Sequence, residues 1–130
     1  MNLNQVTVLV SDLQVSVRFY KTLGLMQIVD SPHYARFECS EGDTTFSLHI
    51  SDAPVVPSTC VIYFETRQLD ERVRDLEHKG MIFDSQPEDM RWEWREARLR
   101  DPDGHPLCLF WAGEFRKNPP WRINKPEGVA

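Results

Sequence analysis

Residues 6–13 read Val-Thr-Val-Leu-Val-Ser-Asp-Leu, and a helical pattern follows them and ends at Gly24. The β-branched run predicts a strand, and Ser11 or Asp12 can cap the start of the helix. Residues 61–64, Val-Ile-Tyr-Phe, begin the same order again in the second half of the chain. The two helical patterns have identical internal spacing, with Leu13, Val17, Tyr20 and Gly24 in the first and Leu69, Val73, Leu76 and Gly80 in the second. We interpret this as an internal duplication, although two unrelated amphipathic helices that follow strands would share part of the pattern.

Three short strands are expected after each helix, which would end at its glycine in a left-handed cap. They are predicted at residues 26–29, 34–39 and 44–50 in the first half, and at 81–83, 91–100 and 106–111 in the second. Asp101-Pro102-Asp103-Gly104 is typical of a type I turn between antiparallel strands. The pattern therefore predicts a single α+β domain over residues 1–130. It would contain two βαβββ modules, at about residues 3–52 and 58–112, and an extended C-terminal arm over 113–130.

The composition argues against several classes of partner. The chain has 130 residues, 41% of them hydrophobic, with 15 basic and 20 acidic side chains and a net charge of −5. The densest basic stretch, residues 91–100, is interleaved with Glu93 and Glu96, so we expect binding neither to nucleic acid nor to an anionic membrane. No run is long enough to span a membrane, the first residues do not resemble a signal peptide, and three widely spaced cysteines do not form a disulfide framework. A cytoplasmic protein is expected.

The two modules, the opening residues 5–13 that lead to Phe19-Tyr20, and the Asp-Pro-Asp-Gly turn at 101–104 together resemble the vicinal oxygen chelate superfamily. This superfamily includes glyoxalase I, bleomycin resistance proteins and extradiol dioxygenases. The resemblance covers about residues 3–112. It implies that each module folds into a curved mixed sheet with its helix outside, and that two modules enclose a cavity. It also implies a homodimer, and Trp111, Trp121 and Ile123 around the polar tail favour one.

Metal-dependent members of this superfamily place His and Glu ligands at four positions. These positions correspond here to Gln5, Ser47 (or His49), Cys60 and Cys108, so the resemblance implies that the usual set of four ligands is missing. We therefore expect no metal and no other cofactor. An alternative is a zinc site formed by His49, Cys60 and Cys108, since two thiolates and an imidazole can bind Zn²⁺. The simpler interpretation is that the cysteines are small buried hydrophobes.

Strand alternation predicts which side chains line the cavity. The predicted pocket residues are Gln5, Thr7, Leu9, Ser47, His49, Cys60, Ile62, Phe64, Trp92, Trp94, Cys108 and Phe110. Trp92 and Trp94 would form a stacking platform for a planar ligand, or else pack in the core or a dimer interface. Glu38 and Glu96 would lie at the pocket rim or form surface ion pairs. His49 is a candidate general acid or base, or a histidine that is merely hydrogen-bonded, so no catalytic residue is assigned.

Two functions follow from these expectations. The favoured one is a metal-free protein, resembling the bleomycin resistance branch, that binds or sequesters a partly aromatic, neutral or cationic small molecule. The alternative is a metal-dependent lyase, isomerase or dioxygenase of the same superfamily with an altered ligand set.

Overall fold

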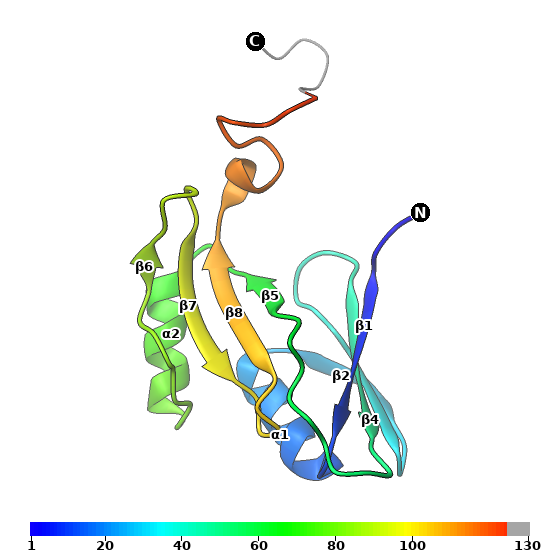
Figure 1. The fold of residues 1–130 in the computed structure, drawn as a ribbon. Helices are drawn as coiled ribbons and strands as arrows, with labels where there is room; N and C mark the ends of the chain where they lie inside the picture. Colours follow the sequence, from blue (N-terminus) through cyan, green and yellow to red (C-terminus); the bar gives the residue numbers. More distant parts are fainter. Residues whose placement is uncertain (125–130) are drawn as a thin grey trace. The chain divides into compact units, whose positions relative to one another are not determined.

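The computed structural model describes residues 1–124, which form two compact units (Figure 1). The first unit consists of residues 1–60 together with residues 100–105, and the second consists of residues 61–99 together with the chain from Pro106 onward. Each unit contains a four-stranded mixed sheet and one α-helix. The predicted α+β class and the order strand, helix and three strands in each half are therefore confirmed.

The first unit has the strand order β1-β4-β3-β2 across its sheet. Strands β1 and β4 run parallel, and the other neighbouring strands run antiparallel. In chain order its elements are β1 (Gln5–Val10), α1 (Leu13–Leu23), β2 (Met26–Asp30), β3 (Tyr34–Glu38) and β4 (Thr45–Ile50). The parallel pairing of the first and last strands places alternate residues of β1 and β4 on one face in register.

Helix α1 begins and ends as its sequence predicts. The Asp12 side chain accepts a hydrogen bond from the Val15 backbone N–H at 3.2 Å, which caps the first turn. Gly24 has a φ of 120°, and its N–H bonds to two carbonyls of the last turn. The apolar side of α1 packs against β3 and β4, where the Tyr20 ring lies 4.7 Å from the Phe46 ring. This packing buries one face of the first sheet, whereas the other face carries polar side chains and the exposed Leu9.

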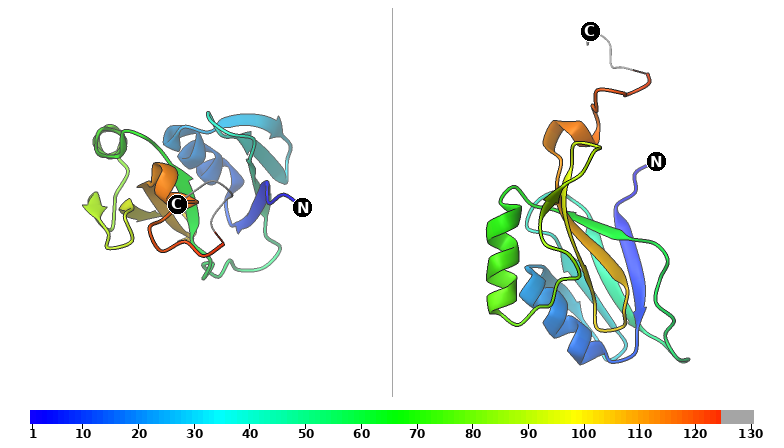
Figure 2. Two further views of the ribbon diagram at one scale, coloured as in Figure 1. Left: turned by 90° about the horizontal axis from the view of Figure 1, so that it is seen from above. Right: turned by 60° about the vertical axis from the view of Figure 1, so that its left-hand side comes forward.

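The second unit repeats this arrangement with the strand order β5-β8-β7-β6. Figure 2 shows α2 running alongside one face of the sheet. The α2 residues Leu69, Val73 and Leu76 are buried, and Gly80 has the positive φ of 96° that its predicted cap requires. The elements are β5 (Ile62–Glu65), α2 (Leu69–His78), β6 (Glu88–Asp89), β7 (Arg95–Arg100), β8 (Pro106–Trp111) and the short 3-10 helix η1 (Gly113–Arg116).

Three predicted segments differ from the structure. Residues 81–83 form no strand, and only Phe83 makes an isolated bridge to Leu99, whereas a short strand forms instead at β6. The strand predicted at residues 91–100 begins at Arg95, because Glu93 has a φ of 70° that interrupts extended backbone. The predicted extended arm contains η1, and its residues 125–130 lie outside the described part of the chain.

The turn at residues 100–105 is bonded tightly into the first unit. The buried Asp101 carboxylate accepts hydrogen bonds from the Tyr20 hydroxyl at 2.7 Å and from two backbone N–H groups of its own turn. The buried His105 ring accepts from the Ser58 N–H through Nδ1 and donates through Nε2 to the Leu9 carbonyl. In His105, Nε2 therefore carries a proton and Nδ1 carries none. These bonds show that the turn containing the Asp-Pro-Asp-Gly motif stabilises the fold of the first unit.

Candidate ligand-binding site

The register of β5 and β8 decides which side chains share the face of the second sheet opposite to α2. Tyr63 pairs with Cys108, whereas Ile62 and Phe64 pair with Leu107 and Leu109 on the other side. The predicted positions of Ile62 and Phe64 beside Cys108 and Phe110 are therefore wrong by one residue. Cys60, from which that alternation was counted, precedes the strand and is exposed. A slip of one residue moves every side chain to the opposite face.

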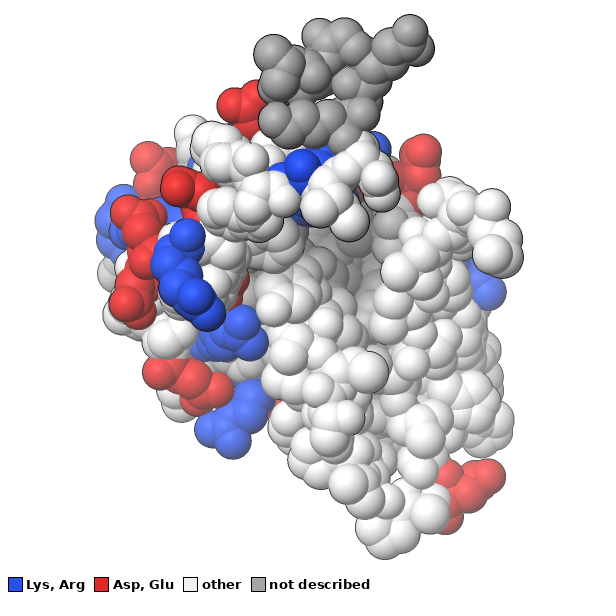
Figure 3. Space-filling model, turned by 45° about the horizontal axis from the view of Figure 1, so that its top comes forward, with Lys and Arg blue, Asp and Glu red and all other residues white. Residues whose placement is uncertain are grey.

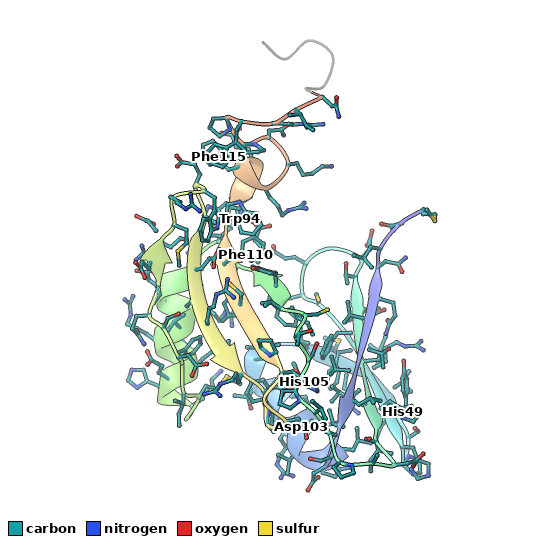
Figure 4. The ribbon with its side chains drawn as sticks, in the orientation of Figure 1. His49, Trp94, Asp103, His105, Phe110 and Phe115 are labelled. Carbon is teal, nitrogen blue, oxygen red and sulfur yellow. The ribbon has the colours of Figure 1, made fainter. Side chains whose placement is uncertain are left out.

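Three rings gather on this face and form what we call the aromatic cluster, Tyr63, Trp94 and Phe110. Trp94 and Phe110 are labelled in Figure 4. The rings of Trp94 and Phe110 stack with centroids 4.7 Å apart and an interplanar angle of 23°. Tyr63 meets both edge-on, at 5.9 Å and 5.5 Å. Phe110 is buried, but the Tyr63 side remains 43% exposed, so the cluster presents an accessible rigid aromatic surface.

Glu96 lies beneath this surface and holds its neighbours in place. It is 1% exposed, and its carboxylate accepts hydrogen bonds from the Trp92 indole N–H at 2.7 Å and from Arg98 at 2.9 Å. Arg98 also donates to the Tyr63 hydroxyl at 3.3 Å. Trp92 was expected on a strand with Trp94, but it lies in the turn before β7 and reaches the face through this hydrogen bond. Glu96 is thus a buried positioning group, which forms the predicted ion pair, with Arg98, but is not at the surface.

Burial, together with the nearby negative charge of Glu96, raises the pKa of the Cys108 thiol to about 12. Cys108 is fully buried in a small apolar group with Phe110, Ala112, Val61 and Trp94. Thiolate is the form of cysteine that attacks electrophiles and binds metals. Cys108 is therefore a packing residue at neutral pH.

The contrast between the exposed Cys60 and the buried Cys108 predicts selective alkylation of the native protein. At pH 8 iodoacetamide is expected to modify the exposed Cys60 and to leave Cys108 unmodified, because a pKa of about 12 leaves on the order of one thiol in ten thousand ionised. Mass spectrometry of tryptic peptides after timed quenching measures both sites. The same experiment in guanidinium chloride should modify both cysteines, and equal rates in the native protein would contradict the assignment.

The corresponding face of the first sheet carries five predicted pocket residues together, namely Gln5, Thr7, Leu9, Ser47 and His49. Ser47 is buried at its centre, where its hydroxyl accepts from the Gln5 side-chain amide at 2.6 Å and bonds to the Tyr34 hydroxyl at 2.6 Å. Tyr34 and Arg36 share this face through β3 and were not among the predicted pocket residues. Alternation along residues 34–38 is the signal that could have found them.

His49 is exposed on this face, and Figure 4 shows it on β4, within the first unit. Its Nδ1 lies 2.7 Å from the Ile50 carbonyl oxygen, so Nδ1 carries a proton and donates to this carbonyl. Its ring lies 6.4 Å from the ring of Tyr34. Within residues 1–124 no carboxylate bonds to His49, so the arrangement lacks the orienting group that catalytic histidines commonly use.

The residues at the family's metal positions carry donor groups that are already engaged or uncharged. Gln5 and Ser47 bond to each other, and the Gln5 carbonyl oxygen also accepts from the Thr45 hydroxyl. Cys108 is protonated and Cys60 is exposed in a loop. Among the described residues, no three or more His, Cys, Asp or Glu side chains are grouped so as to hold a metal ion. An amide, a hydroxyl and a thiol do not fit a divalent cation.

The charged surface has mixed sign. In Figure 3 acidic and basic side chains gather at the left, over α2, β6 and β7 of the second unit. Arg95 bonds there to both Asp70 and Asp89, at 2.8 Å and 3.0 Å. A shallow hollow at the edge strand β2, lined by Lys21 and residues 24–30, contains no aromatic ring and none of the predicted site residues. No helix within residues 1–124 has the length and apolar character needed to cross a membrane.

Comparison with known proteins identifies the family. The model of the Glyoxalase/Bleomycin resistance protein/Dioxygenase superfamily matches residues 2–109, and the chain belongs to this superfamily, as its sequence predicted. The chain is 30% identical over 125 residues to the uncharacterized protein YraH of Bacillus subtilis (strain 168), an alignment that covers 85% of this chain and 98% of YraH.

Solved structures agree with this assignment at the level of the fold. A glyoxalase/bleomycin resistance protein/dioxygenase from Nocardioides is 21% identical, with a TM-score of 0.75 over 95% of this chain and 90% of that chain. TnmS3, an antibiotic binding protein from Streptomyces sp. CB03234, is 23% identical, with a TM-score of 0.74 over 86% of this chain and 96% of that chain.

Proposed function

We propose that this protein binds a small, planar, uncharged aromatic molecule on the aromatic cluster of the second unit, without a metal ion. The observation that carries the proposal is the accessible surface of Tyr63 beside stacked Trp94 and Phe110. Rigid rings with few rotatable bonds lose little entropy when a ligand stacks on them. The likeness to TnmS3, described as an antibiotic binding protein, accords with such a role.

The arginines of this face favour an uncharged ligand over a cationic one. The Arg98 guanidinium lies 5.8 Å from the Tyr63 ring centroid, and Arg91 lies 5.9 Å from that of Trp92. A ligand cation would compete with these groups for the same ring faces and would be repelled by them. The Glu96 carboxylate offers no compensation, because Trp92 and Arg98 already occupy its oxygens.

The metal-dependent alternative has less support. A lyase, isomerase or dioxygenase of this superfamily would need anionic or imidazole ligands, whereas the family positions here hold an amide, a hydroxyl and two cysteines, one of them with a strongly raised pKa. The alternative ligand set of His49, Cys60 and Cys108 contains a buried thiol whose neighbour is the negatively charged Glu96. We therefore favour binding over metal-assisted catalysis.

A matched series of three naphthalene derivatives tests the proposal: neutral 2-naphthamide, anionic 2-naphthoate and a cationic trimethyl-2-naphthylammonium salt. Two-dimensional ¹H–¹⁵N NMR resolves the indole N–H signals of the four tryptophans. We expect 2-naphthamide to shift the signals of Trp94 and Trp92, with the cation at least about tenfold weaker. Shifts confined to the other two tryptophans, or tighter binding of the cation, would overturn the proposal.

We also propose that the protein acts as a homodimer in the cytoplasm. Trp121 and Ile123 are 55% and 80% exposed, and all three cysteines are free thiols. Size-exclusion chromatography with light scattering at micromolar concentration is expected to give twice the mass of the chain. The double variant Trp121→Ala, Ile123→Ala should move the population towards monomer, because exposed apolar groups of this size commonly lie in interfaces. A wild-type protein that elutes as a monomer contradicts the dimer.

A further inference from the structure

Arg36 differs from Arg95, Arg98 and Arg116 in the partners of its side chain. Arg95, Arg98 and Arg116 each face a carboxylate within 4 Å. Arg36 has no carboxylate partner within residues 1–124, although it lies on a sheet face rather than on a loop or helix surface. An ordered guanidinium without a counter-ion is a ready binding group for an anion.

The Arg36 side chain is held in place by the groups around it. Its Nε donates to the Tyr34 hydroxyl at 2.9 Å, and its guanidinium lies 5.4 Å from the centroid of the Tyr34 ring. The Tyr34 hydroxyl bonds in turn to the buried Ser47, which accepts from Gln5. Among residues 1–124 Arg36 uses only Nε in hydrogen bonds, so both of its terminal nitrogens remain as donors to an added ligand. Two parallel N–H donors match the two oxygens of a carboxylate.

The electrostatics of Tyr34 agree with this geometry. Burial raises the pKa of its hydroxyl, but hydrogen bonds from Ser47 and Arg36 and the positive charge of Arg36 outweigh that effect, and the pKa lies below its usual value. The nearest acidic group along β3 is Glu38, two residues from Arg36 and therefore about 7 Å away along the strand. Glu38 lies opposite Thr45 in the sheet and forms no ion pair with Arg36.

We propose that this face of the first sheet binds the carboxylate of a small organic acid through the terminal nitrogens of Arg36, with Tyr34 as the positioning residue. The site belongs to the first unit and involves no member of the aromatic cluster. It does not depend on the binding of an uncharged aromatic molecule proposed above. The ligand class it predicts is a compact carboxylic acid, because one guanidinium supplies one bidentate contact.

Acetate is the direct probe, because it has a carboxylate and no ring that could stack on the aromatic cluster. In an NMR titration at constant ionic strength, acetate should shift the Arg36 side-chain Nε–H signal and the backbone N–H signals of β3. Acetamide, which has the same shape without the charge, should produce no such shifts. Absence of any acetate shift at Arg36 up to 100 mM would overturn the proposal.

Two variants separate a specific contact from a change in net charge. Arg36→Gln should weaken acetate binding at least about tenfold, the loss of one charge-assisted bidentate contact. Arg18→Gln removes the same charge from the exposed side of α1 and should leave binding unchanged. If both variants weaken acetate binding equally, the effect comes from the net charge of the protein and the proposed Arg36 site is wrong. Thermal unfolding curves of both variants verify that they fold.

A second arm distinguishes a carboxylate from other oxyanions. Inorganic phosphate, whose oxygens can also accept two parallel N–H bonds, is titrated in the same way. Tyr34→Phe should weaken acetate binding several-fold and broaden the Arg36 Nε–H signal, which a purely structural role for the hydroxyl would not do. Phosphate that binds at least tenfold more tightly than acetate would overturn the carboxylate assignment.

Discussion

Replacing Asp101 with alanine is expected to lower the free energy of unfolding by about 3 kcal/mol or more, the largest effect of any single substitution considered. The buried carboxylate accepts three hydrogen bonds, from the Tyr20 hydroxyl and from the backbone N–H groups of Asp103 and His105. Each donor left without an acceptor in a buried position costs about 1–3 kcal/mol. Burial, and the charge and hydrogen bond of Asp101, raise the pKa of Tyr20, so its hydroxyl remains a donor. Urea denaturation followed by circular dichroism measures the change.

Two further variants control for the substitution. Asp101→Asn keeps an oxygen acceptor for the turn and should lose markedly less stability than Asp101→Ala. Asp103→Ala removes a side chain of the same turn that, within the described part of the chain, accepts only from the Ser11 N–H. It should lower the free energy of unfolding by about 1 kcal/mol. If Asp101→Ala lowers the free energy of unfolding no more than Asp103→Ala does, the buried hydrogen bonds of Asp101 do not anchor the turn.

Replacing Trp94 with alanine is expected to reduce the affinity for 2-naphthamide by about 30-fold, which corresponds to about 2 kcal/mol. Trp94 supplies both the stacked partner of Phe110 and an edge contact with Tyr63. Its loss removes the flat surface on which the ligand would lie and leaves Phe110 without its neighbour. Titration by NMR or isothermal calorimetry gives the ratio of dissociation constants.

Trp121 provides the matched control, because it is the same residue type, is 55% exposed and lies in the C-terminal segment. Trp121→Ala should leave the affinity for 2-naphthamide within about twofold. Trp94→Phe should recover part of the loss, since a smaller ring can still stack. Equal affinities of the wild type and Trp94→Ala would remove the aromatic cluster from the site.

The local sequence pattern was sufficient to predict the order of helices and strands and the residues that share the exposed face of the first sheet. The valines at every second position, Val6, Val8 and Val10, predicted correctly that Gln5 and Thr7 share a face with Ser47. Helix caps at Asp12 and Gly24 are local interactions, so the sequence carries them directly.

The residues on the corresponding face of the second sheet could not be predicted from the sequence pattern. Residues 61–64 are all apolar or aromatic, and a run without alternation leaves the register open by one residue. The positive φ of Glu93, which places Trp92 in a turn, has no sequence signal such as glycine or asparagine. The bond between Tyr20 and Asp101 joins residues 81 positions apart, and only the folded chain brings them together.

Native mass spectrometry of freshly purified protein, prepared without chelators, tests the claim of metal-free binding most directly. Spectra should show the chain without a stoichiometric metal ion, and addition of 2-naphthamide should produce one adduct per chain whether or not EDTA is present. The contradicting result is a metal ion at one equivalent per chain that EDTA removes and that the double variant Cys60→Ser, Cys108→Ser lacks. This result would favour the metal-dependent enzyme.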